Sequence, residues 1–291
     1  MDNKPLVYII LLNYNGYKDT LECIASLENI CYENYEILIV DNNSKDNSEA
    51  IIKEAYPQYR FIQTQENLGF AGGNNIGIHY ALENGAEYVC LLNNDTIVEP
   101  DFLTELVKTA KENEDAGIVG GIIHEYEEID KIWYSGGYFS ELKGKTIHEQ
   151  RVCENSTKEV GFITGCLQLI HKDVIQKVGV LPEEYFIYYE DLDYCFQVKQ
   201  AGYKLIVNNK AKIYHKCGGT ASYVSPISVF YSNKNYYLFI RKFFRGNFKY
   251  LYLYTFYIIR TIIKLLIFRK DRKKAVLKAF KCNLNIKNQG S

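Results

Sequence analysis

The chain has 291 residues, of which 47% are hydrophobic and 24% charged, with only five prolines. This composition excludes a disordered protein and a string of modules on flexible linkers, and the length suits one large α/β domain with an appendage or two small domains. The net charge of −1 conceals an asymmetry: residues 226–291 hold 15 Lys and Arg against one acid, so the totals of 34 basic and 35 acidic residues leave 19 and 34 for residues 1–225.

Strand-like and helix-like segments alternate along the first 123 residues. Residues 6–12 form a continuous apolar run, which is typical of a strand buried on both faces. Strands that alternate with helices favour right-handed βαβ units and a mostly parallel sheet with helices on both faces. The further strands are predicted at 37–40, 59–63, 88–92 and 117–123, and the helices at 17–29, 47–56, 73–84 and 101–113.

The pattern changes after residue 131. The aromatic and glycine-rich segment 133–139 is typical of an antiparallel hairpin or of a loop over a cleft. We therefore expect one domain over residues 1–221, followed by a helical, basic region at 222–291. The remaining elements of the domain are predicted as a strand at 167–170, helices at 171–179 and 190–201, and one or two short strands within 204–214.

The eight cysteines contain no C-x-x-C pair and no metal-finger spacing. Several of them lie within apolar runs, and no secretory leader precedes the first predicted strand. The sequence therefore predicts free, buried thiols in a reducing cytoplasm.

Three of the predicted strands end in polar clusters, at residues 13–15, 41–44 and 93–95. A lone aspartate after a strand is more often a cap or turn residue. Ligands of open α/β sheets bind beyond the carboxyl ends of the strands, so three clusters at these ends indicate a shared ligand site. The first βα turn, Asn13–Gly16, is neither a Gly-x-Gly-x-x-Gly turn nor a P-loop, which disfavours dinucleotide and P-loop phosphate binding.

The residue types of these clusters suit a nucleotide and a divalent cation. The carboxylate of Asp41 can accept an imide N–H of uracil or thymine. Asp95, flanked by side-chain amides, is a candidate hard-oxygen ligand for Mg²⁺ or Mn²⁺. The glycine-rich segment 67–75 joins a strand to a helix, where backbone can approach a ligand closely and the helix N-terminus favours phosphate oxygens.

The second half of the domain adds acids and a histidine. Glu190, Asp191 and Asp193 follow two tyrosines. Acids at a helix start ordinarily complement the helix dipole, but the tyrosines favour a cleft wall, where a carboxylate can take a proton from an attacking hydroxyl. His215 precedes a glycine pair and is either a structural histidine or a third metal ligand.

Together these motifs resemble the family 2 glycosyltransferases of the GT-A fold, from about Val7 to Thr220, and in particular the bacterial rhamnosyltransferase-like branch, which builds cell-surface polysaccharide. The resemblance implies a GT-A catalytic domain at 1–221, with a nucleotide-sugar-binding half at 1–123 and an acceptor half at 124–221. The matching segments, in family order, are Leu-Asn-Tyr-Asn-Gly, Val-Asp-Asn-Asn-Ser, Asn-Leu-Gly-Phe-Ala-Gly-Gly-Asn-Asn, Leu-Leu-Asn-Asn-Asp-Thr, Thr-Gly-Cys, Tyr-Glu-Asp-Leu-Asp and Tyr-His-Lys-Cys-Gly-Gly.

The same resemblance implies a role for individual residues. Asp191 would be the catalytic base, Glu190 is a second candidate catalytic carboxyl, and Asp95 and His215 would hold Mg²⁺ or Mn²⁺. Many relatives have Asp-x-Asp where this chain has Asn93-Asn94-Asp95, so Asp95 alone supplies the negative ligand. The acceptor side would include Gly165, Cys166 and Tyr188. The residues implied to bind the nucleotide sugar are Asn13, Asn15, Asp41, Ser44, Asn67, Gly69, Gly72, Asn74, Asn93 and Asn94.

The expected reaction is an inverting transfer. An acceptor hydroxyl attacks the anomeric carbon while Asp191 removes its proton, and the metal stabilises the departing nucleoside diphosphate. The favoured donor, from the branch resemblance only, is dTDP-rhamnose, and the acceptor is a saccharide or lipid-linked saccharide. UDP-hexose and UDP-N-acetylhexosamine remain open as donors. A catalytically inactive sugar-nucleotide or polysaccharide binding protein is a further alternative, whereas a nucleotidyltransferase would need an arginine-containing glycine-rich loop at Asn13–Gly16.

The basic C-terminal region predicts a polyanionic partner. Residues 250–268 are almost long enough to span a bilayer, but Arg260 and Lys264 would be costly at its centre. With Lys249 they fall on one stripe of a helix. This pattern favours an amphipathic helix in the membrane interface, with the basic residues 269–274 against anionic lipid at the inner face of the cell membrane.

A soluble helical appendage or a homodimer contact is the alternative for this region. No nucleic-acid-binding motif accompanies the charge, so we expect no nucleic-acid partner.

Overall fold

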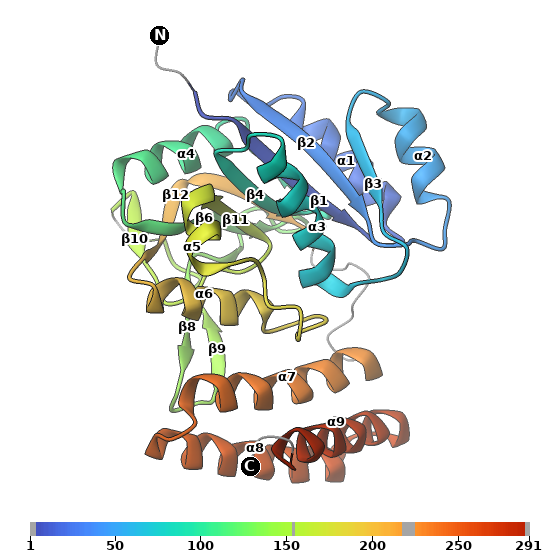
Figure 1. Ribbon diagram of the computed structural model, residues 1–291, viewed down its shortest axis with the longest axis vertical. Helices are drawn as coiled ribbons and strands as arrows, with labels where there is room; N and C mark the ends of the chain where they lie inside the picture. The colour runs from blue at the N-terminus through green and yellow to red at the C-terminus, as the bar shows by residue number, and fades with distance from the viewer. Residues whose placement is uncertain (1–3, 153–154, 217–224, 289–291) are drawn as a thin grey trace.

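The computed structural model describes residues 4–152, 155–216 and 225–288, which form an α/β body with a layer of helices beneath it (Figure 1). The Cys-Gly-Gly segment at 217–219, the predicted domain boundary after residue 221 and Cys153 lie outside the described residues.

A mixed sheet of ten strands forms the centre of the body, in the order β10-β12-β6-β11-β4-β1-β2-β3, with β5 paired to β12 and β7 to β6. The strands are β1 (Val7–Asn13), β2 (Tyr35–Asp41), β3 (Arg60–Gln63), β4 (Tyr88–Asn93), β5 (Thr96–Val98), β6 (Ala116–Glu125), β7 (Ile132–Tyr134), β10 (Thr157–Glu159), β11 (Leu167–His171) and β12 (Lys204–His215).

The β4-β1-β2-β3 part of the sheet is parallel throughout, as the βαβ pattern predicts. In this register Asn13 lies beside Asp41, and Leu12 lies beside Asn93. The predicted polar clusters therefore meet at one edge of the sheet, because parallel neighbours end on the same side. β11 then joins this part to β6 through antiparallel pairs on both of its sides.

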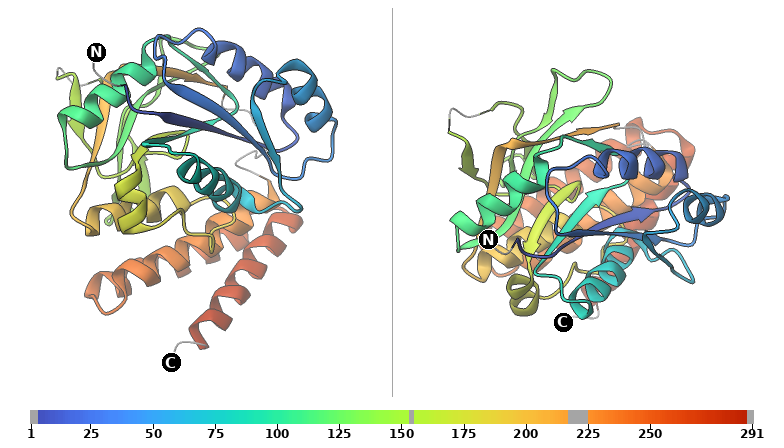
Figure 2. Two further views of the ribbon diagram at one scale, coloured as in Figure 1. Left: turned by 45° about the horizontal axis from the view of Figure 1, so that its top comes forward. Right: turned by 90° about the horizontal axis from the view of Figure 1, so that it is seen from above.

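Helices cover both faces of the sheet, with α1, α2 and α4 on one face and α3, α5 and α6 on the other (Figure 2). Their bounds are α1 (Tyr17–Leu27), α2 (Ser48–Ala55), α3 (Gly69–Glu83), α4 (Phe102–Glu112), α5 (Lys172–Val178) and α6 (Glu190–Gln200). This arrangement confirms the predicted fold class.

The prediction for α3 places its start four residues too late, at 73 instead of Gly69. Glycine lowers helix propensity, so a run with three glycines does not look helical in the sequence. The tertiary structure requires these glycines for close packing. A Cβ at Gly73 would overlap Leu12 of β1, and one at Gly77 would lie 2.7 Å from Ile10.

Other differences concern short or irregular strands. β5 and β10 are not predicted because strands of three residues show no period, and both form by pairing with β12. The segment predicted as one or two short strands within 204–214 is the single strand β12, whose register with β6 shifts between Asn208 and Lys212.

The glycine-rich segment after residue 133 forms an antiparallel hairpin of β8 (Gly137–Ser140) and β9 (Lys145–His148), as predicted. The hairpin extends from the body toward the helical layer (Figure 1). At its tip, Tyr252 Oη donates to the carbonyl of Leu142 at 2.7 Å. The aromatic residues just before it, Trp133 and Tyr134, belong instead to β7 at the sheet edge.

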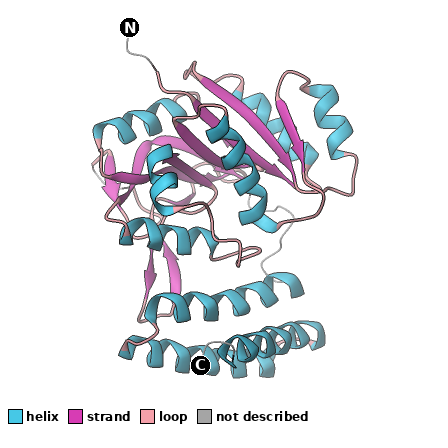
Figure 3. Cartoon of the chain, in the orientation of Figure 1, coloured by secondary structure: helices cyan, strands magenta, loops and turns pink. Residues whose placement is uncertain are grey.

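The C-terminal layer consists of α7 (Pro226–Phe244), α8 (Phe248–Ile267) and α9 (Lys270–Asn288) (Figure 3). Ser225 caps α7 by accepting from Ser228 N, and Asn247 caps α8 by accepting from Lys249 N, as is usual for these residues at a helix start. The buried face of α7 is apolar and aromatic, and its side chains belong to the same hydrophobic core as the sheet. The helical layer therefore packs firmly on the body.

The predicted cationic stripe of α8 faces the protein. Lys249 pairs with Glu141 at 2.6 Å, Arg260 donates to the carbonyl of Gly144 at 3.2 Å, and Lys264 donates to Asn233 Oδ1 at 2.7 Å. Burial lowers the pKa of Lys264 to about 8.

The opposite face of α8 is apolar and exposed. α8 is also the one helix in the described ranges that is long and apolar enough to cross a membrane. Its exposed large apolar residues are Phe248, Leu251, Tyr252, Ile259, Ile262, Ile263, Leu266 and Ile267.

The six cysteines that the structure describes are all free thiols, as predicted. The prediction that the thiols are buried is confirmed for Cys23, Cys90, Cys166 and Cys195. It is wrong for Cys31, which is exposed, and for Cys282, which is partly exposed.

Candidate active site

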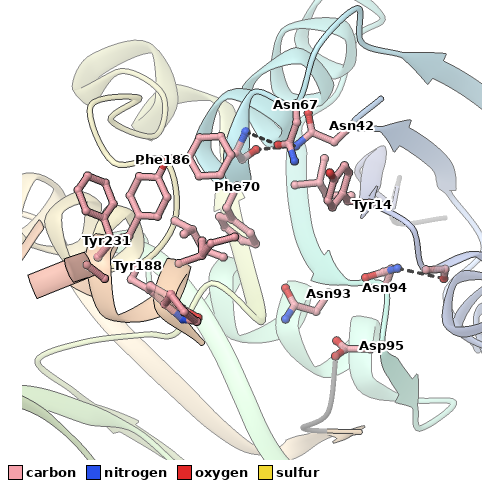
Figure 4. Close-up of a pocket in the computed structure, with 18 of the residues that line it drawn as sticks. Tyr14, Asn42, Asn67, Phe70, Asn93, Asn94, Asp95, Phe186, Tyr188 and Tyr231 are labelled. Atoms are coloured by element: carbon pink, nitrogen blue, oxygen red, sulfur yellow. Dashed lines mark hydrogen bonds between the residues drawn. The ribbon is translucent and has the colours of Figure 1, made fainter. Parts of the chain in front are cut away.

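Two adjoining cavities open beside the carboxyl ends of β1, β2 and β4. The larger cavity measures about 820 Å³ and is lined by the strand ends, the start of α3, the loop at 186–188 and residues of α7 and α9 (Figure 4). The smaller cavity measures about 420 Å³ and is lined by residues around the start of α6 and the hairpin. The two cavities share Phe70, Asn93, Ile187, Tyr188 and His215.

Asn13, Asp41 and Ser44 are brought together as predicted, but in a hydrogen-bonded network behind the cavity wall. Asn13 Nδ2 donates to Asp41 Oδ1 at 2.6 Å, and Ser44 Oγ donates to the same oxygen at 2.6 Å. Asn13 and Asp41 are fully buried, and neither lines the larger cavity. Asn15 accepts from Lys45 N and is likewise outside the lining. The network fixes the two strand-end turns, and direct contact of these side chains with a nucleotide base stays a prediction.

Tyr14 and Asn42, the residues that follow Asn13 and Asp41, face the cavity in their place (Figure 4). Asn42 Nδ2 donates to Asn67 Oδ1 at 3.0 Å and to the carbonyl of Gly69 at 2.9 Å. These bonds tie the end of β2 to the start of α3. Both residues belong to the strand-end motifs, and their position in these turns is the sequence feature that points to the site.

Asn67 and Gly69 line the larger cavity, as predicted. Gly72 and Asn74, predicted at the helix start, lie inside α3, which begins at Gly69, and neither lines the larger cavity, so their contact with a nucleotide sugar stays a prediction. Asn74 is buried and its side chain donates to the carbonyl of Phe70 at 2.9 Å. Gly72 lies against Leu68, which a Cβ at Gly72 would approach to 2.8 Å.

Gly69 lies where the start of α3 contacts the loop at 186–188. Its φ of +73° is in the left-handed region that favours glycine, and a Cβ there would overlap the carbonyl oxygen of Phe186. The next amide, Phe70 N, donates to that oxygen at 2.7 Å. The backbone of the loop before α6 therefore rests directly on the start of α3.

Asp95 and His215 meet at the inner end of the larger cavity. Asp95 Oδ1 lies 3.1 Å from His215 Nε2, and both side chains are close to fully buried. The antiparallel pairing of His215 with Thr96 of β5 brings them together from positions 120 residues apart. Asn93 and Asn94 line the same wall, and Asn94 Nδ2 donates to Thr20 Oγ1 at 2.9 Å.

The donor set of this pair fits a divalent cation in part. A carboxylate oxygen is a common ligand of both Mg²⁺ and Mn²⁺, whereas an imidazole nitrogen is a ligand of transition metals and favours Mn²⁺ over Mg²⁺. Within the described ranges, no third His, Cys, Asp or Glu completes a cluster with them. A cation here would need oxygen ligands from a bound diphosphate and from water.

Asp191 lines the smaller cavity at the start of α6, together with the predicted acceptor-side residues Gly165, Cys166 and Tyr188. Its Oδ2 accepts from Gly165 N at 3.0 Å and its Oδ1 accepts from Leu192 N at 2.8 Å. Burial raises the pKa of Asp191, and these backbone hydrogen bonds offset part of the rise. The carboxylate is thus held in one orientation at the cavity wall.

The neighbouring acids differ from Asp191. Glu190 is buried, and its Oε2 has no hydrogen-bond partner among the described residues, so burial and then the charge of Asp191 raise its pKa well above the usual range. Asp193 faces away from the cavity and pairs with Lys242 of α7 at 2.9 Å. Of the three acids, Asp191 has the surroundings of an ionised carboxylate within a cleft.

The backbone before Asp191 is strained. Tyr188 and Tyr189 have φ values of +69° and +79°, a conformation that costs on the order of 1–3 kcal/mol per residue for side chains of this size. Asn235 of α7, fully buried, donates from Nδ2 to the carbonyls of Ile187 and Tyr188, each at 2.8 Å. The sequence motifs assign no role to Asn235, because its neighbours Lys234 and Tyr236 give no sign that it reaches this loop.

Aromatic side chains dominate the smaller cavity. Trp133 of β7, His148 of β9 and Phe162 line it, with the rings of Trp133 and His148 5.0 Å apart. Such rings offer flat apolar surfaces to the faces of sugar rings. The segment at 133–139 was predicted as a hairpin or a loop over a cleft, and its first aromatic residue does line a cavity.

Comparison with known proteins adds to this geometry. The sequence profile of Glycosyl transferase family 2 matches residues 8–179. A low-salt glycan biosynthesis hexosyltransferase of Haloferax volcanii is 27% identical over 66% of this chain, and the chain covers 61% of that protein's length. The dTDP-rhamnosyl transferase RfbF of Shigella flexneri is 27% identical over 81% of this chain and 80% of its own. Among solved structures, the mannosyltransferase PcManGT of Pyrobaculum calidifontis, in complex with GDP-Man and Mn²⁺, has a TM-score of 0.62 at 12% identity, over 97% of this chain and 81% of that chain.

Proposed function

The chain belongs to glycosyl transferase family 2, and from this premise we propose that it is an inverting, metal-dependent enzyme that transfers a sugar from a nucleoside diphosphate to a hydroxyl of a saccharide or lipid-linked saccharide. One observation carries the proposal. Asp95 lines only the larger cavity, Asp191 lines only the smaller cavity, and the cavities meet at Asn93, Phe70 and Tyr188. A donor in the first cavity and an acceptor in the second would meet at this junction.

The nucleotide half of the donor would lie against the strand ends. Tyr14 and Asn42 face this part of the cavity, and the buried Asn13–Asp41 network holds their turns in place. Asn67, Gly69 and the amide-bearing Asn93 and Asn94 line the path from there to Asp95. The bound donor would thus run along the carboxyl edge of the parallel strands, the usual ligand position in such sheets.

Transfer requires one displacement. The acceptor oxygen forms a bond to the anomeric carbon as the bond from that carbon to the diphosphate oxygen breaks, and the acceptor proton passes to the carboxylate of Asp191. Attack opposite to the leaving group inverts the anomeric centre. Mg²⁺ or Mn²⁺ held by Asp95 and His215 would neutralise the negative charge that gathers on the leaving diphosphate. Gly165 N and Leu192 N keep the base aimed at the smaller cavity throughout.

Rhamnose from dTDP-rhamnose is the favoured donor sugar, because a relative named as a dTDP-rhamnosyl transferase aligns with this chain over most of both lengths. UDP-hexose and UDP-N-acetylhexosamine are the alternatives. The product would enter a cell-surface polysaccharide.

The exposed apolar face of α8 supports a location at the inner, cytoplasmic face of the cell membrane. With the cationic stripe turned into the protein, this face can enter the lipid interface while the basic start of α9 meets anionic headgroups. A homodimer through the same face is the alternative. Binding to vesicles of anionic lipid at low salt supports the membrane location, whereas no vesicle binding combined with a dimeric mass in solution supports the dimer.

A thermal-shift panel of sugar nucleotides, with and without Mn²⁺, tests the function as a whole. We expect one donor to raise the melting temperature most, and Mn²⁺ to increase that rise, since a ligand that binds only the folded state stabilises it. Release of nucleoside diphosphate in the presence of acceptor then tests turnover. Donor binding without turnover on any saccharide acceptor would favour the alternative of a non-catalytic binding protein.

A further inference from the structure

The larger cavity extends from the α/β body to the C-terminal helices. Its outer part is walled by Ile227, Phe230 and Tyr231 of α7 and by Lys274 and Lys278 of α9. Tyr231 stacks on Phe186 of the body, with ring centroids 4.9 Å apart, and this pair stands across the cavity from the strand ends (Figure 4). One continuous space therefore connects Asp95 with α9.

Lys274 and Lys278 lie one helical turn apart, so they share a face of α9. No carboxylate of the described residues lies within ion-pair distance of either ammonium group, and Lys278 Nζ sits 5.3 Å from the centre of the Phe230 ring. By contrast, two other cations near the body have carboxylate partners. Lys216 pairs with Asp19, and Lys242 pairs with Asp193.

The acids in this cavity do not cancel the two lysines. Asp95 lies at the inner end against His215, and Asp19 is bonded to Lys216. Asp271, one turn before Lys274 on α9, is the only other acid in the lining. The outer part of the cavity therefore holds an excess of positive charge beside an aromatic and apolar wall.

We propose that Lys274 and Lys278 form a diphosphate-binding subsite at the outer part of the larger cavity. The proposal rests on the proposed function, which places a diphosphate in or beside this cavity. Two adjacent ammonium groups suit the two phosphates of such an ester, and each can make charge-assisted hydrogen bonds to its oxygens. The two lysines supply positive charge that does not depend on a bound metal ion. Such charge is useful here because Asn93 stands where many relatives have an acidic metal ligand.

The diphosphate can come from two molecules with this chemistry. One is the nucleoside diphosphate of the donor, which lies at the inner end of the same cavity. The other is a prenyl diphosphate that carries the acceptor saccharide. The apolar neighbours Ile227 and Phe230, and the exposed apolar end of α8 at Leu266 and Ile267, are suited to a prenyl chain.

Titration calorimetry on the purified full chain distinguishes the sources. The probes are dTDP and UDP for the donor, and geranyl diphosphate for a prenyl diphosphate. The variant Lys274→Gln/Lys278→Gln removes both charges from exposed positions without burial or loss of packing. The matched control, Lys270→Gln/Lys281→Gln, removes two exposed lysines of the same helix that do not line the cavity.

We expect the affinity for one of the two classes of probe to fall about tenfold or more in the Lys274/Lys278 variant and to stay unchanged in the control. A fall for the nucleotides alone assigns the subsite to the donor, and a fall for geranyl diphosphate assigns it to the acceptor. Equal affinities of wild type and variant for every probe would overturn the subsite while leaving the proposed function standing. A wild-type chain that binds none of the probes would overturn both.

Discussion

Glu190 and Asp191 are adjacent carboxyl groups at the start of α6 that are both buried but differ in their hydrogen bonds. Asp191 receives two backbone N–H groups at the wall of the smaller cavity, which stabilise its ionised form. Glu190 is buried with an unpartnered oxygen, which favours its neutral form. The first turn of α6 thus contains one carboxylate held by two backbone N–H groups and one carboxyl whose pKa burial raises.

This difference predicts opposite results for two isosteric substitutions. Asp191→Asn should lower kcat by roughly 10²–10⁴-fold, because the acceptor proton loses its base, while donor binding in a thermal-shift assay stays as in the wild type. Glu190→Gln should keep kcat within a few-fold, because glutamine has the shape and charge of the neutral acid. Release of nucleoside diphosphate measures both. Turnover by Asp191→Asn at the wild-type rate would exclude Asp191 as the base.

The same substitution at Glu190 should reveal the cost of its burial. A carboxyl whose pKa is raised in the folded state contributes stability that is fully present below its unfolded pKa and is lost as the pH rises through the folded pKa. Glutamine does not titrate. The melting temperature of Glu190→Gln relative to the wild type should therefore increase with pH above the ordinary glutamate range. Parallel melting curves across that range would contradict a neutral, buried Glu190.

At the scale of single elements, α7 connects the C-terminal helical layer to the segment that carries Asp191. Asn235 holds the carbonyls of Ile187 and Tyr188, and Lys242 pairs with Asp193 inside α6. Both contacts reach the segment that carries Asp191, and the left-handed tyrosines between them would relax toward commoner conformations without such bonds. α7 therefore fixes the position of Asp191, the proposed base, from outside the α/β body.

Replacing Asn235 tests this positioning role. Asn235→Ala leaves two carbonyls without their donor, so we expect kcat to fall about tenfold while the affinity for the donor nucleotide stays unchanged. The matched control is Asn233→Ala, two residues away on the same helix, which removes the acceptor of Lys264 instead. Both variants should melt at lower temperature, but the control should keep its kcat. Equal kcat values in the two variants would contradict the positioning role and leave Asn235 with a structural role alone.

At the scale of the whole molecule, a mixed sheet and a helical layer share one hydrophobic core but present different surfaces. The body is acidic and carries the strand-end site, whereas the C-terminal layer is basic and exposes the apolar face of α8. The larger cavity lies where the two meet. A lipid-linked acceptor held by the layer would thus arrive beside a donor held by the body.

Two exposed residues near the end of α8 test the membrane surface. Leu266→Ser/Ile267→Ser removes apolar side chains that are 74% and 69% exposed, so the fold should be little affected. We expect binding to anionic vesicles in a flotation assay to fall severalfold, because interfacial affinity scales with buried apolar area. Turnover with a water-soluble acceptor should be unchanged. A loss of that turnover would instead indicate that this end of α8 supports the active site.

Much of the fold and part of the site could be predicted from the sequence, because they depend on local patterns. Apolar runs identify β1, β2 and β4, and parallel pairing brings their polar ends to one edge, so the neighbourhood of Asp41, Asp95 and their asparagines follows. The segment Glu190–Asp193 is also recognisable in the sequence, because its acids follow two tyrosines at a predicted helix start. The resemblance to family 2 glycosyltransferases rests on the same short motifs.

Only the tertiary structure decides which of these residues reach the cavities. Turn geometry places Asn13 and Asp41 behind the cavity wall and brings Tyr14 and Asn42 into the cavity lining, a choice that a run of consecutive polar residues does not specify. Contacts between segments far apart in the chain decide three further features. They turn the cationic stripe of α8 inward, join Asn235 to the loop before Asp191, and bring α9 to the wall of the larger cavity. Sequence periodicity shows that a helix has two faces, but which face meets the protein is decided by the packing of distant elements.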